Sequence, residues 1–370
     1  MRVKLDKVCK RIYAGGDVPK DRYSTVKTAE YAIPIYANAE KYNGLYGYTD
    51  TARENELSIT VAARGTIGFT AIRREPFLPV VRLITVVPDL STVSERYLYY
   101  ALRNCKPAFS GTSIPQLTVP DIKKNEIELY SLSVQKTIAD KLDAVGRIIE
   151  LRQQQLQKLD EFVKARFVEL FGDKTKFKNE PLRKNVEEMF IGPFGSALKN
   201  ECFVDKDNAY CMVYEQKHAI RKTLDVPTRY VNTEKYTELK RFTVQGGDII
   251  VSCRGTIGEI YSVPENAPLG IMHPSIMKIR LKKSKYCNLF FVIMLEQYMR
   301  ESINKANGSG VKMAVTATEL GEEVFIVPEI SLQLDFEQFV HQVDKSKVAV
   351  QKSLDEAQLL FNSLMQKYFS

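Results

Sequence analysis

Two arginines occupy the same place in a repeated pentapeptide, and their side chains could bind nucleic acid. Arg64 and Arg254 each begin the run Arg-Gly-Thr-Ile-Gly, 190 positions apart. A guanidinium group can donate hydrogen bonds to a phosphate or to the edge of a guanine. The two glycines of each run also permit a tight turn with positive φ, so each run equally suits a hairpin that only holds its domain together. The sequence leaves both interpretations open.

Few other residues have the types and spacing that catalysis or metal binding requires. The three histidines are too dispersed along the chain for a metal cluster. The sequence has no phosphate loop, no glycine-rich dinucleotide turn and no Asn-Pro-Pro-Tyr tetrapeptide of the amino-methyltransferases. Asp121, Glu126 and Glu128 resemble a nuclease carboxylate cluster, but no lysine follows two residues after either glutamate. We therefore expect a binding protein without a catalytic, metal or cofactor site.

The bulk composition describes a globular, moderately basic protein. At 370 residues the chain can bury two cores of ordinary domain size, and 44% hydrophobic with 26% charged residues is globular composition. No run of 18 apolar residues occurs and the first residues lack a signal-peptide core, so neither a membrane span nor a leader is expected. Six scattered cysteines indicate reduced thiols and a cytosolic protein. Residues 1–132 and 173–330 carry +5 and +3 of the net charge of +8, which favours a polyanionic partner.

The pentapeptide is one landmark of a longer internal repeat. Residues 59–70 (ITVAARGTIGFT) match residues 249–260 (IIVSCRGTIGEI), and Ser110-Gly111 recurs as Ser309-Gly310. Leu-Ser-Val-Gln at 132–135 recurs as Ile-Ser-Leu-Gln at 330–333. A repeat this long is a duplicated domain and not a solenoid. The sequence thus predicts two similar surfaces related by a pseudo-two-fold axis, which suit a target that also has two halves.

Each copy ends in a polar segment of about forty residues with heptad periodicity. Apolar residues alternate at steps of four and three, which is the seam of a coiled coil. The seam residues are Ile138, Leu142, Val145, Ile149, Leu156, Leu159 and Val163 in the first copy, and Phe336, Val340, Val343, Val350, Leu354, Phe361 and Leu364 in the second. Polar residues interrupt the seams at Arg152, Arg166 and Lys347. We expect two long helices that pair antiparallel, the first ending at Gly172 in a left-handed cap.

The two globular parts are expected to be small mixed α/β domains, which makes the whole chain α+β. In the first, strands are predicted at 57–63, 80–87 and 123–130, with a short helix at 94–104 capped by Ser94. In the second, strands are predicted at 248–252, 259–263 and 275–281, with a helix at 286–305. In both parts the order is a helix, a Ser-Gly loop, a strand and then the long helix.

This arrangement resembles the specificity subunit of type I restriction-modification enzymes. The resemblance is carried by the two strand–Arg-Gly-Thr-Ile-Gly–strand units, each followed by a helix, a Ser-Gly loop and a long heptad helix. The runs ARFVELFGD at 165–173 and IGPFGSALK at 191–199 also resemble that family. It implies that 1–132 and 173–330 are target recognition domains, each reading one half of a bipartite site in double-stranded DNA. Residues 133–172 and 331–370 would be conserved helical regions that set the spacing of the halves.

The resemblance also implies which partners and cofactors to expect. Two modification subunits would use S-adenosylmethionine to methylate adenine, and restriction subunits would use ATP, with magnesium, to translocate and cut DNA. These partners would bind largely through the helical regions, in the cytoplasm of a prokaryote, and this chain would hold no cofactor. Two alternatives stay open, namely the specificity protein of a related methyltransferase-nuclease and a coiled-coil adaptor with two protein-binding heads and no DNA role.

Candidate DNA contacts are the basic residues of the two globular parts. The positive charge is not concentrated in one run, so the sequence does not rank them. The candidates are Lys20, Arg22, Lys27, Arg64, Arg73 and Arg74 in the first part, and Lys199, Lys217, Arg221, Lys222, Arg229, Lys240, Arg241 and Arg254 in the second.

Overall fold

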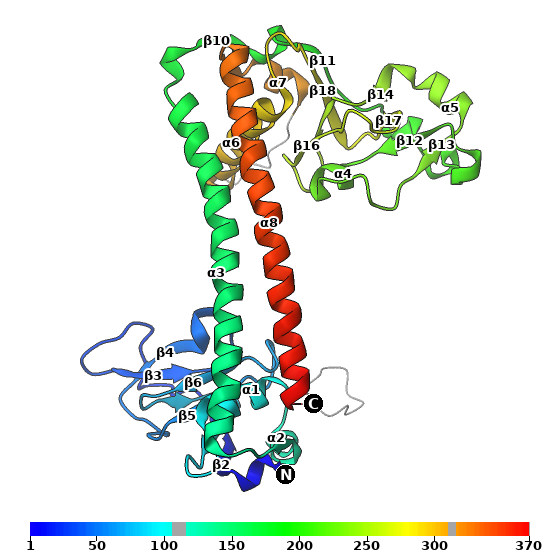
Figure 1. Ribbon diagram of the computed structural model, residues 1–370. Coiled ribbons are helices and arrows are strands. Elements are labelled where there is room, and N and C mark those ends of the chain that lie inside the picture. Colours follow the sequence, from blue (N-terminus) through cyan, green and yellow to red (C-terminus); the bar gives the residue numbers. More distant parts are fainter. Residues whose placement is uncertain (106–115, 310–315, 370) are drawn as a thin grey trace. The chain divides into compact units, whose positions relative to one another are not determined.

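The computed structural model describes residues 1–105, 116–309 and 316–369, and it divides into two compact units. Unit 1 contains Met1–Gln157 with Val348–Ser370, and unit 2 contains Lys158–Lys347. Helices α3 (Leu132–Phe171) and α8 (Ile330–Phe369) each contribute to both units. Each unit therefore consists of a globular head and one part of each long helix (Figure 1).

Most elements of the two heads correspond and follow the same order. In the described part of the first head the elements are strands β1 (Arg2–Lys4), β2 (Cys9–Ala14), β3 (Ile33–Tyr36), β4 (Leu45–Thr49), β5 (Ser58–Val61), β6 (Thr70–Arg73), β7 (Leu78–Pro79), β8 (Ile84–Pro88) and β9 (Glu126–Glu128), with helices α1 (Glu95–Arg103) and α2 (Val119–Lys124). In the second head they are strands β10 (Lys178–Pro181), β11 (Val186–Ile191), β12 (Cys211–Tyr214), β13 (Tyr230–Val231), β14 (Thr243–Val244), β15 (Ile249–Ser252), β16 (Ile260–Ser262), β17 (Gly270–Met272), β18 (Ile276–Leu281) and β19 (Val324–Val327), with helices α4 (Gln216–Arg221), α5 (Thr233–Glu238), α6 (Asn288–Ser309) and α7 (Ala317–Glu322). The second head thus has β14, α4 and α5 in addition to the elements described for the first.

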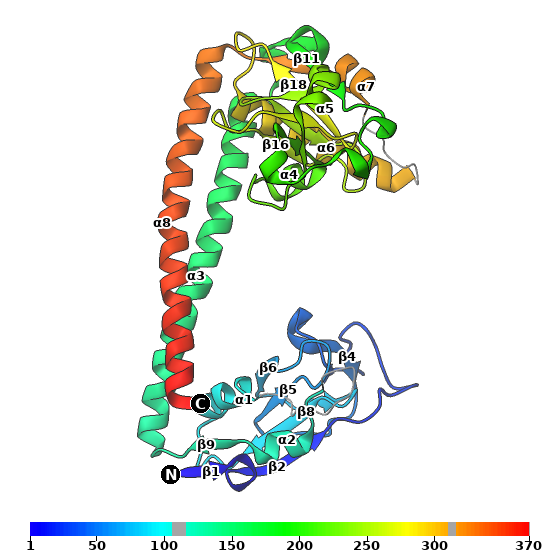
Figure 2. The ribbon, with the colours of Figure 1, turned by 90° about the vertical axis from the view of Figure 1, so that its right-hand side faces the viewer.

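The sheets of the two heads have the same strand order, except that β14 adds a fourth strand to one sheet of the second head (Figures 1 and 2). The antiparallel sheet β2-β8-β5-β6 corresponds to β11-β18-β15-β16. The sheet β4-β3-β7 corresponds to β13-β12-β17-β14, and in both of them the second and third strands are parallel. A two-stranded ribbon, β1-β9 or β10-β19, completes each head. The repeat in the sequence is therefore a repeat of a whole α+β head, as predicted.

Each head shares its core with the two long helices. In unit 1, residues of β5 and β8 pack with α1, and Ile138 and Leu142 at the start of α3 and Phe361 near the end of α8 join the same cluster. In unit 2, residues of β15 and β18 pack with α6, and Phe336 of α8 and Phe171 of α3 join that cluster. Apolar burial thus fixes the beginning of one long helix and the end of the other to each head.

A buried glutamine ties each long helix to its own head. The side chain of Gln135 is fully buried; its Oε1 accepts from the Ser94 N–H at 2.8 Å, and its Nε2 donates to the carbonyls of Thr92 and Tyr130 at 2.9 Å. Gln333 repeats this pattern in the second head, accepting from Cys287 and donating to two carbonyls. These are the glutamines of the repeated Leu-Ser-Val-Gln and Ile-Ser-Leu-Gln motifs, so the motif has a structural role.

The long helices run antiparallel, as the heptads predicted. In unit 1 Arg152 of α3 donates to Ser353 of α8 at 3.2 Å, and in unit 2 Lys347 of α8 pairs with Asp160 of α3 at 2.7 Å. Two of the three polar residues that interrupt the seam, Arg152 and Lys347, thus find partners across it, which fixes the register, while Arg166 pairs with Glu169 on its own helix. All fourteen predicted seam residues are buried or half-buried. Within the part of the chain that the structure describes, no helix has the length and apolarity needed to span a membrane.

Three local predictions need correction. The strand predicted at 80–87 begins only at Ile84, because Val81 and Arg82 have φ values of 52° and 62° and form a turn. The strand predicted at 123–130 is shorter, because residues 119–124 form α2. Gly172 follows the last residue of α3 but does not take the predicted left-handed conformation. A Cβ there would lie 2.4 Å from the Val168 carbonyl oxygen, so glycine is needed for space.

Helices α2 and α7 were missed, although the sequence carries a signal for them. Thr118 accepts from the Asp121 N–H at 3.3 Å and Thr316 accepts from the Glu319 N–H at 3.1 Å. A threonine followed by an acidic residue three positions later is a common helix start. Of the two Ser-Gly pairs, Ser110, Gly111 and Gly310 lie outside the described residues, so that prediction is not tested.

Candidate nucleic-acid interface

The Arg-Gly-Thr-Ile-Gly runs form the hairpin turns β5–β6 and β15–β16. The glycines have positive φ, at 70° and 83° for Gly65 and Gly68 and at 68° and 85° for Gly255 and Gly258. Residues with a Cβ rarely adopt these angles, so the glycines are required by the turn itself. The hairpin interpretation is therefore correct for the glycines, while the arginine that begins each turn remains available for another role.

The two arginines differ in how they are held. Both side chains are exposed. Arg64 donates through Nε and Nη2 to Oε1 of Gln116, at 2.9 and 2.6 Å. Arg254 has no hydrogen-bond or ion-pair partner among the described residues. The guanidinium of the second turn is thus free to bind a ligand, whereas that of the first is positioned by an amide.

Other loops of the second head meet the Arg254 turn. The Cys253 N–H donates to the Ser275 carbonyl at 2.9 Å, and the His273 N–H donates to the Tyr214 carbonyl at 2.8 Å. The Gly192 N–H donates to the Ile276 carbonyl at 3.0 Å. We call this set of loops, residues 192–194, 215–217, 253–258 and 273–275, the second loop end. Four chain segments from separate places in the sequence therefore form one surface.

The first head has an equivalent surface, the first loop end, formed by residues 15–17, 37–39, 63–68 and 80–82. The Val81 N–H donates to the Gly16 carbonyl at 2.8 Å. Asn38 connects two of the loops, because its Oδ1 accepts from the Ala63 N–H at 2.8 Å and its Nδ2 donates to the Val81 carbonyl. Loops carried by a rigid sheet are where binding residues commonly lie, and both heads present such a set.

A buried carboxylate organises the cations beside the second loop end. Glu215 is 7% exposed and pairs with Lys217 at 2.6 Å and with Arg229, whose guanidinium stacks 4.1 Å from the Phe203 ring. Burial alone would raise the pKa of Glu215, but the hydrogen bonds from Arg229 and Lys217 outweigh it and the pKa lies below its usual value. Burial lowers the pKa of His273 in the same surface, so that imidazole is neutral at pH 7. Lys217 and Arg229 therefore point at a protein anion, with about a third of each side chain exposed.

The remaining predicted contacts are scattered over the heads. Lys20, Lys27, Arg221, Lys240 and Arg241 are exposed, and so is Lys199, which pairs with Glu201 at 4.0 Å. Arg22, Arg74 and Lys222 are exposed but form ion pairs with Asp50, Glu95 and Glu296. Solvated ion pairs of this kind contribute little to stability, so each of these cations can exchange its carboxylate for a phosphate.

Arg73, which was predicted to contact DNA, has a buried side chain. It is 3% exposed, its Nε donates to Thr60 at 3.1 Å, its Nη2 donates to the Asn43 carbonyl at 2.8 Å, and its guanidinium lies 3.6 Å from the Tyr36 ring centre. Successive residues of a strand point to opposite faces, so Arg73 and Arg74 cannot share a surface. Arg73 is part of the core of the first head, so its guanidinium is not on the surface as the prediction required.

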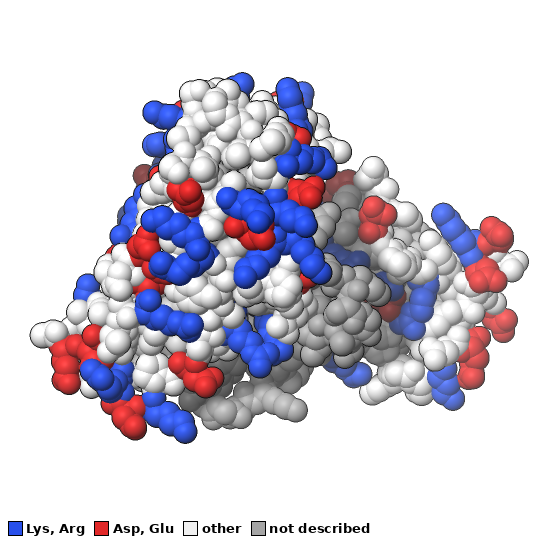
Figure 3. Space-filling view, turned by 90° about the horizontal axis from the view of Figure 1, so that it is seen from below, with Lys and Arg blue, Asp and Glu red and all other residues white. Residues whose placement is uncertain are grey.

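A basic surface that the sequence did not indicate lies on the first head, around β1, β2 and α2. It combines residues of β1, β2 and the turn between them with residues of α2, which are distant in the sequence. Its exposed members are Arg2, Lys4, Lys7, Lys10, Arg11, Lys123 and Lys124. Figure 3 views the molecule from the end at which these elements lie in Figure 1, and lysine and arginine gather there with some carboxylates among them. The missed α2 is the reason that this surface was not predicted.

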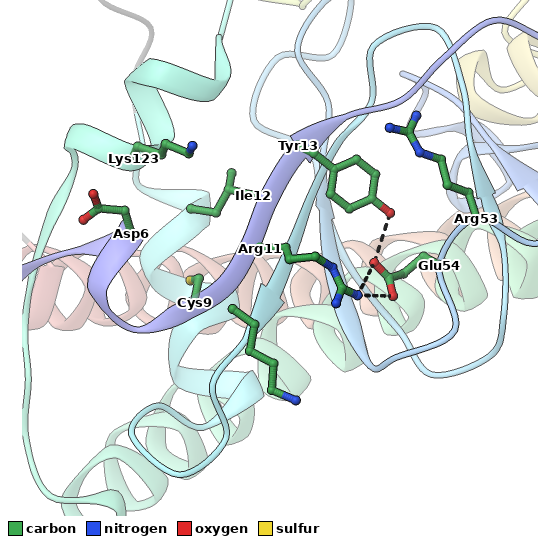
Figure 4. A pocket seen from close by; sticks show the side chains of 9 residues that line it. Asp6, Cys9, Arg11, Ile12, Tyr13, Arg53, Glu54 and Lys123 are labelled. Atoms are coloured by element: carbon green, nitrogen blue, oxygen red, sulfur yellow. Dashed lines mark hydrogen bonds and ion pairs between the residues drawn. The ribbon is translucent and has the colours of Figure 1, made fainter.

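A polar depression of about 530 Å³ opens on this surface, lined by residues that include Lys10, Arg11 and Lys123 (Figure 4). Arg11 Nη2 donates to Glu54 Oε1 at 2.9 Å and the Tyr13 hydroxyl donates to Glu54 Oε2 at 3.0 Å. Burial, together with Asp6 and Asp89, raises the pKa of the Cys9 thiol to about 12, so it is not a nucleophile at pH 7. Among the described residues, no His, Cys, Asp and Glu side chains form a group suited to a metal ion. The side chains that line the depression therefore form a network of ion pairs and hydrogen bonds.

Known proteins with the same features identify the family. The family model described as "Type I restriction modification DNA specificity domain" matches residues 1–161 and 184–357. A putative type I specificity subunit of Mycoplasma pneumoniae is 37% identical over 171 residues, which cover 43% of this chain and 50% of the relative. A second such subunit of that organism is 36% identical over 165 residues, covering 42% and 45%. This chain thus spans about half the length of the curated relatives it matches.

Solved structures show the same fold. A chain from a study of complex assembly and conformational transition in the type I restriction-modification system aligns with a TM-score of 0.65 and 14% identity, covering 100% of this chain and 97% of that one. The type I S subunit of M. genitalium aligns with a TM-score of 0.55 and 15% identity, covering 100% and 96%. Two family matches, one on each head, agree with the duplicated topology. The chain belongs to the family of type I restriction-modification DNA specificity domains.

Proposed function

We propose that this chain is the DNA-recognition subunit of a type I restriction-modification complex, in which each head reads one half of a bipartite duplex site. The observation that carries the proposal is the pair of equivalent loop ends, which are built by corresponding strands of the two heads and differ in their side chains. Loop ends of the same backbone arrangement suit two segments of one duplex, and their different side chains suit two different base sequences. Bases are read through donor, acceptor and methyl patterns, which such loops can match.

Cations at the loop ends supply the binding affinity in this proposal. Arg254 is unpaired among the described residues, and Lys217 and Arg229 flank the same loops. Phosphate contacts orient a protein on the duplex and release counterions, so binding weakens as salt rises. Arg64, held by Gln116, is a pre-positioned donor at the equivalent point of the first head. We assign the phosphate contacts first to these residues.

The long helices supply the surface for the modification subunits. Apolar side chains outside the predicted seam positions are exposed on both helices, although apolar residues in contiguous arrays usually avoid water. They are Ile148, Leu151, Val348, Leu359 and Leu360 in unit 1 and Phe162, Val168 and Leu334 in unit 2. Phe162 and Leu360 are 53% and 50% exposed and occupy equivalent positions of the two repeats, 198 residues apart. An equivalent site on each helix suits two copies of one partner.

In this proposal the chain contributes no catalytic group. The modification subunits would hold S-adenosylmethionine, and the restriction subunits that they recruit would hold ATP and magnesium. Adenine methylation and DNA cleavage would then occur at sites whose position is set by the two heads. The proposal predicts that the purified chain alone neither methylates nor cuts DNA.

The test is selection of duplexes from a randomised pool by the chain together with its modification subunit, followed by mobility-shift titration. The expected result is a site in two parts with a fixed gap. Arg254→Ala should weaken binding at all salt concentrations and reduce the slope of log affinity against log salt by about 1. Arg183→Ala, which removes an exposed cation paired with Glu322, is the control and should leave the slope unchanged. Absence of DNA binding with and without the partner would favour the adaptor alternative, and methyl transfer by the chain alone would refute a non-catalytic role.

A further inference from the structure

Gln216 of the second loop end carries an amide that the protein itself does not use. Its Oε1 is buried and has no hydrogen-bond partner. Exchanging the oxygen and the nitrogen of the amide would only place an unpaired donor at that position. Buried polar groups are nearly always hydrogen-bonded, and an orphaned one costs free energy unless something outside the chain pairs with it. The side chain as a whole is half-buried, so its amide can turn towards solvent.

The position of Gln216 places this amide against the turn that carries the free arginine. Gln216 is the first residue of α4, which follows β12 directly, and the Glu215 N–H that precedes it donates to His218 Nδ1 at 2.9 Å. A Cβ at Gly255 would lie 3.6 Å from Gln216 Oε1 and 3.7 Å from its Nε2. The amide therefore lies against the residue that follows Arg254. An unpaired amide thus lies against the backbone of the turn whose first residue, Arg254, has an exposed guanidinium without a partner among the described residues.

The equivalent amide of the first head is already occupied. Asn38 stands two residues after Tyr36, the last residue of β3, just as Gln216 stands two residues after Tyr214, the last residue of β12. Both amide atoms of Asn38 bond to the protein, to the Ala63 N–H and the Val81 carbonyl. One copy of the repeat thus uses the position to join its loops, and the other keeps the amide unused.

We infer that Gln216 reads an adenine in the half-site bound by the second head. This inference rests on the proposed function and assigns a base to one residue of it. A carboxamide presents one acceptor and two donors, and adenine presents a matching N6 donor and N7 acceptor in the major groove. On binding, the amide turns from Gly255 to the base, the oxygen gains the partner that it lacks, and Arg254 holds an adjacent phosphate. Asn38 has no such role in the first half-site.

The test uses the full chain with its modification subunit and the duplex selection described above. Wild-type protein must first yield a two-part site, and exchange of residues 173–330 for those of a relative identifies the half that the second head reads. If no two-part site is obtained, the proposed function fails, which is a separate result. In the identified half, Gln216→Ala should lower the preference for one adenine by a factor from about 5 to about 150, the range for a bidentate base contact. Every other position should keep its preference.

Two further variants make the result specific. Gln216→Glu replaces the amide with a group that only accepts, so preference at that position should move from adenine towards cytosine. Gln245→Ala removes an exposed glutamine that precedes β15, at the opposite end of that strand from the Arg254 turn, and should change no preference. Gln216→Ala should unfold at or above the wild-type temperature, because it removes the orphaned acceptor, whereas Asn38→Ala should lower the unfolding temperature of unit 1. The inference is overturned if both Gln216 variants keep all base preferences, if the half read by the second head has no preferred adenine, or if both variants fail to fold.

Discussion

Replacing Gln333 with leucine tests whether one buried amide holds the second head to α8. The change preserves the size of the side chain and removes its three hydrogen bonds, from Cys287 N–H at 3.0 Å and to the carbonyls of Lys285 and Pro328 at 2.8 Å. Gln333 is fully buried, so water reaches these groups poorly. A buried group that loses its partner costs about 1 to 3 kcal/mol, so three such groups cost about 3 kcal/mol or more.

The expected shift in unfolding temperature follows from the size of the unit. Unit 2 spans residues 158–347, and domains of 150–250 residues lose roughly 2 to 4 °C for each kcal/mol. Gln333→Leu should therefore lower the unfolding temperature of unit 2 by about 6 to 12 °C in calorimetry. Hydrogen exchange should show the loss first at the start of α6 and of α8, because Cys287 and Gln333 lie there.

Gln338→Leu is the matched control, because it makes the same change at an exposed position of the same helix. Exposed substitutions of this kind change stability by about 0.5 kcal/mol or less. The reasoning is refuted if the two variants unfold within about 2 °C of each other. Gln135→Leu should reproduce the effect in unit 1, since its amide makes the same three types of bond.

Three further predictions concern the helix pair and pH. Leu354→Asp should lower the unfolding temperature of unit 1, because it places a charge at a half-buried seam position at a cost of several kcal/mol. Leu359→Asp changes a residue that is 72% exposed on the same helix, so it should leave that temperature unchanged. It should instead weaken binding of the modification subunit in pull-down assays. Inserting one heptad into both helices lengthens them by about 10 Å, or roughly three base pairs, so methylated sites should show a gap wider by that amount; an unchanged gap in an active complex would rule out a spacing role. Burial lowers the folded-state pKa of His218 and of His273 below 6.5, so the unfolded chain binds more protons in acid than the folded chain does. In urea unfolding, the stability of unit 2 should therefore be constant above about pH 6.5 and fall as the pH drops below that value. Equal stability at pH 7.5 and at pH 5.5 would contradict this prediction.

Periodic features of the sequence predicted the architecture well. The heptads predicted both long helices, the position of each helix after its globular part predicted their antiparallel pairing, and the repeated pentapeptide predicted two equivalent hairpins. These predictions succeed because periodicity reports which face of an element is buried, and burial decides the fold. The cap of α1 by Ser94 was also correct, since the Ser94 hydroxyl accepts from the Tyr97 N–H at 3.3 Å.

Side-chain environments could not be predicted in the same way. Arg73 and Arg74 are adjacent in the sequence, yet one lies in the core and the other in solvent, because that distinction depends on which face of β6 the sheet covers. The free amide of Gln216 and the bonded amide of Asn38 occupy equivalent places, and only the contacts of neighbouring loops separate them. The basic surface of β1, β2 and α2 likewise arises from segments that are distant in the sequence.

The most direct test of the central claim is a domain exchange read out by the methylated sites. Residues 173–330 would be replaced by the equivalent segment of a relative, and the complex with the modification subunit would methylate DNA whose modified adenines are then located by single-molecule sequencing. If each head reads one half-site, one half of the recognised sequence changes while the other half and the gap stay as they were. If both halves change together, or neither changes, the heads do not read the DNA independently and the account is wrong.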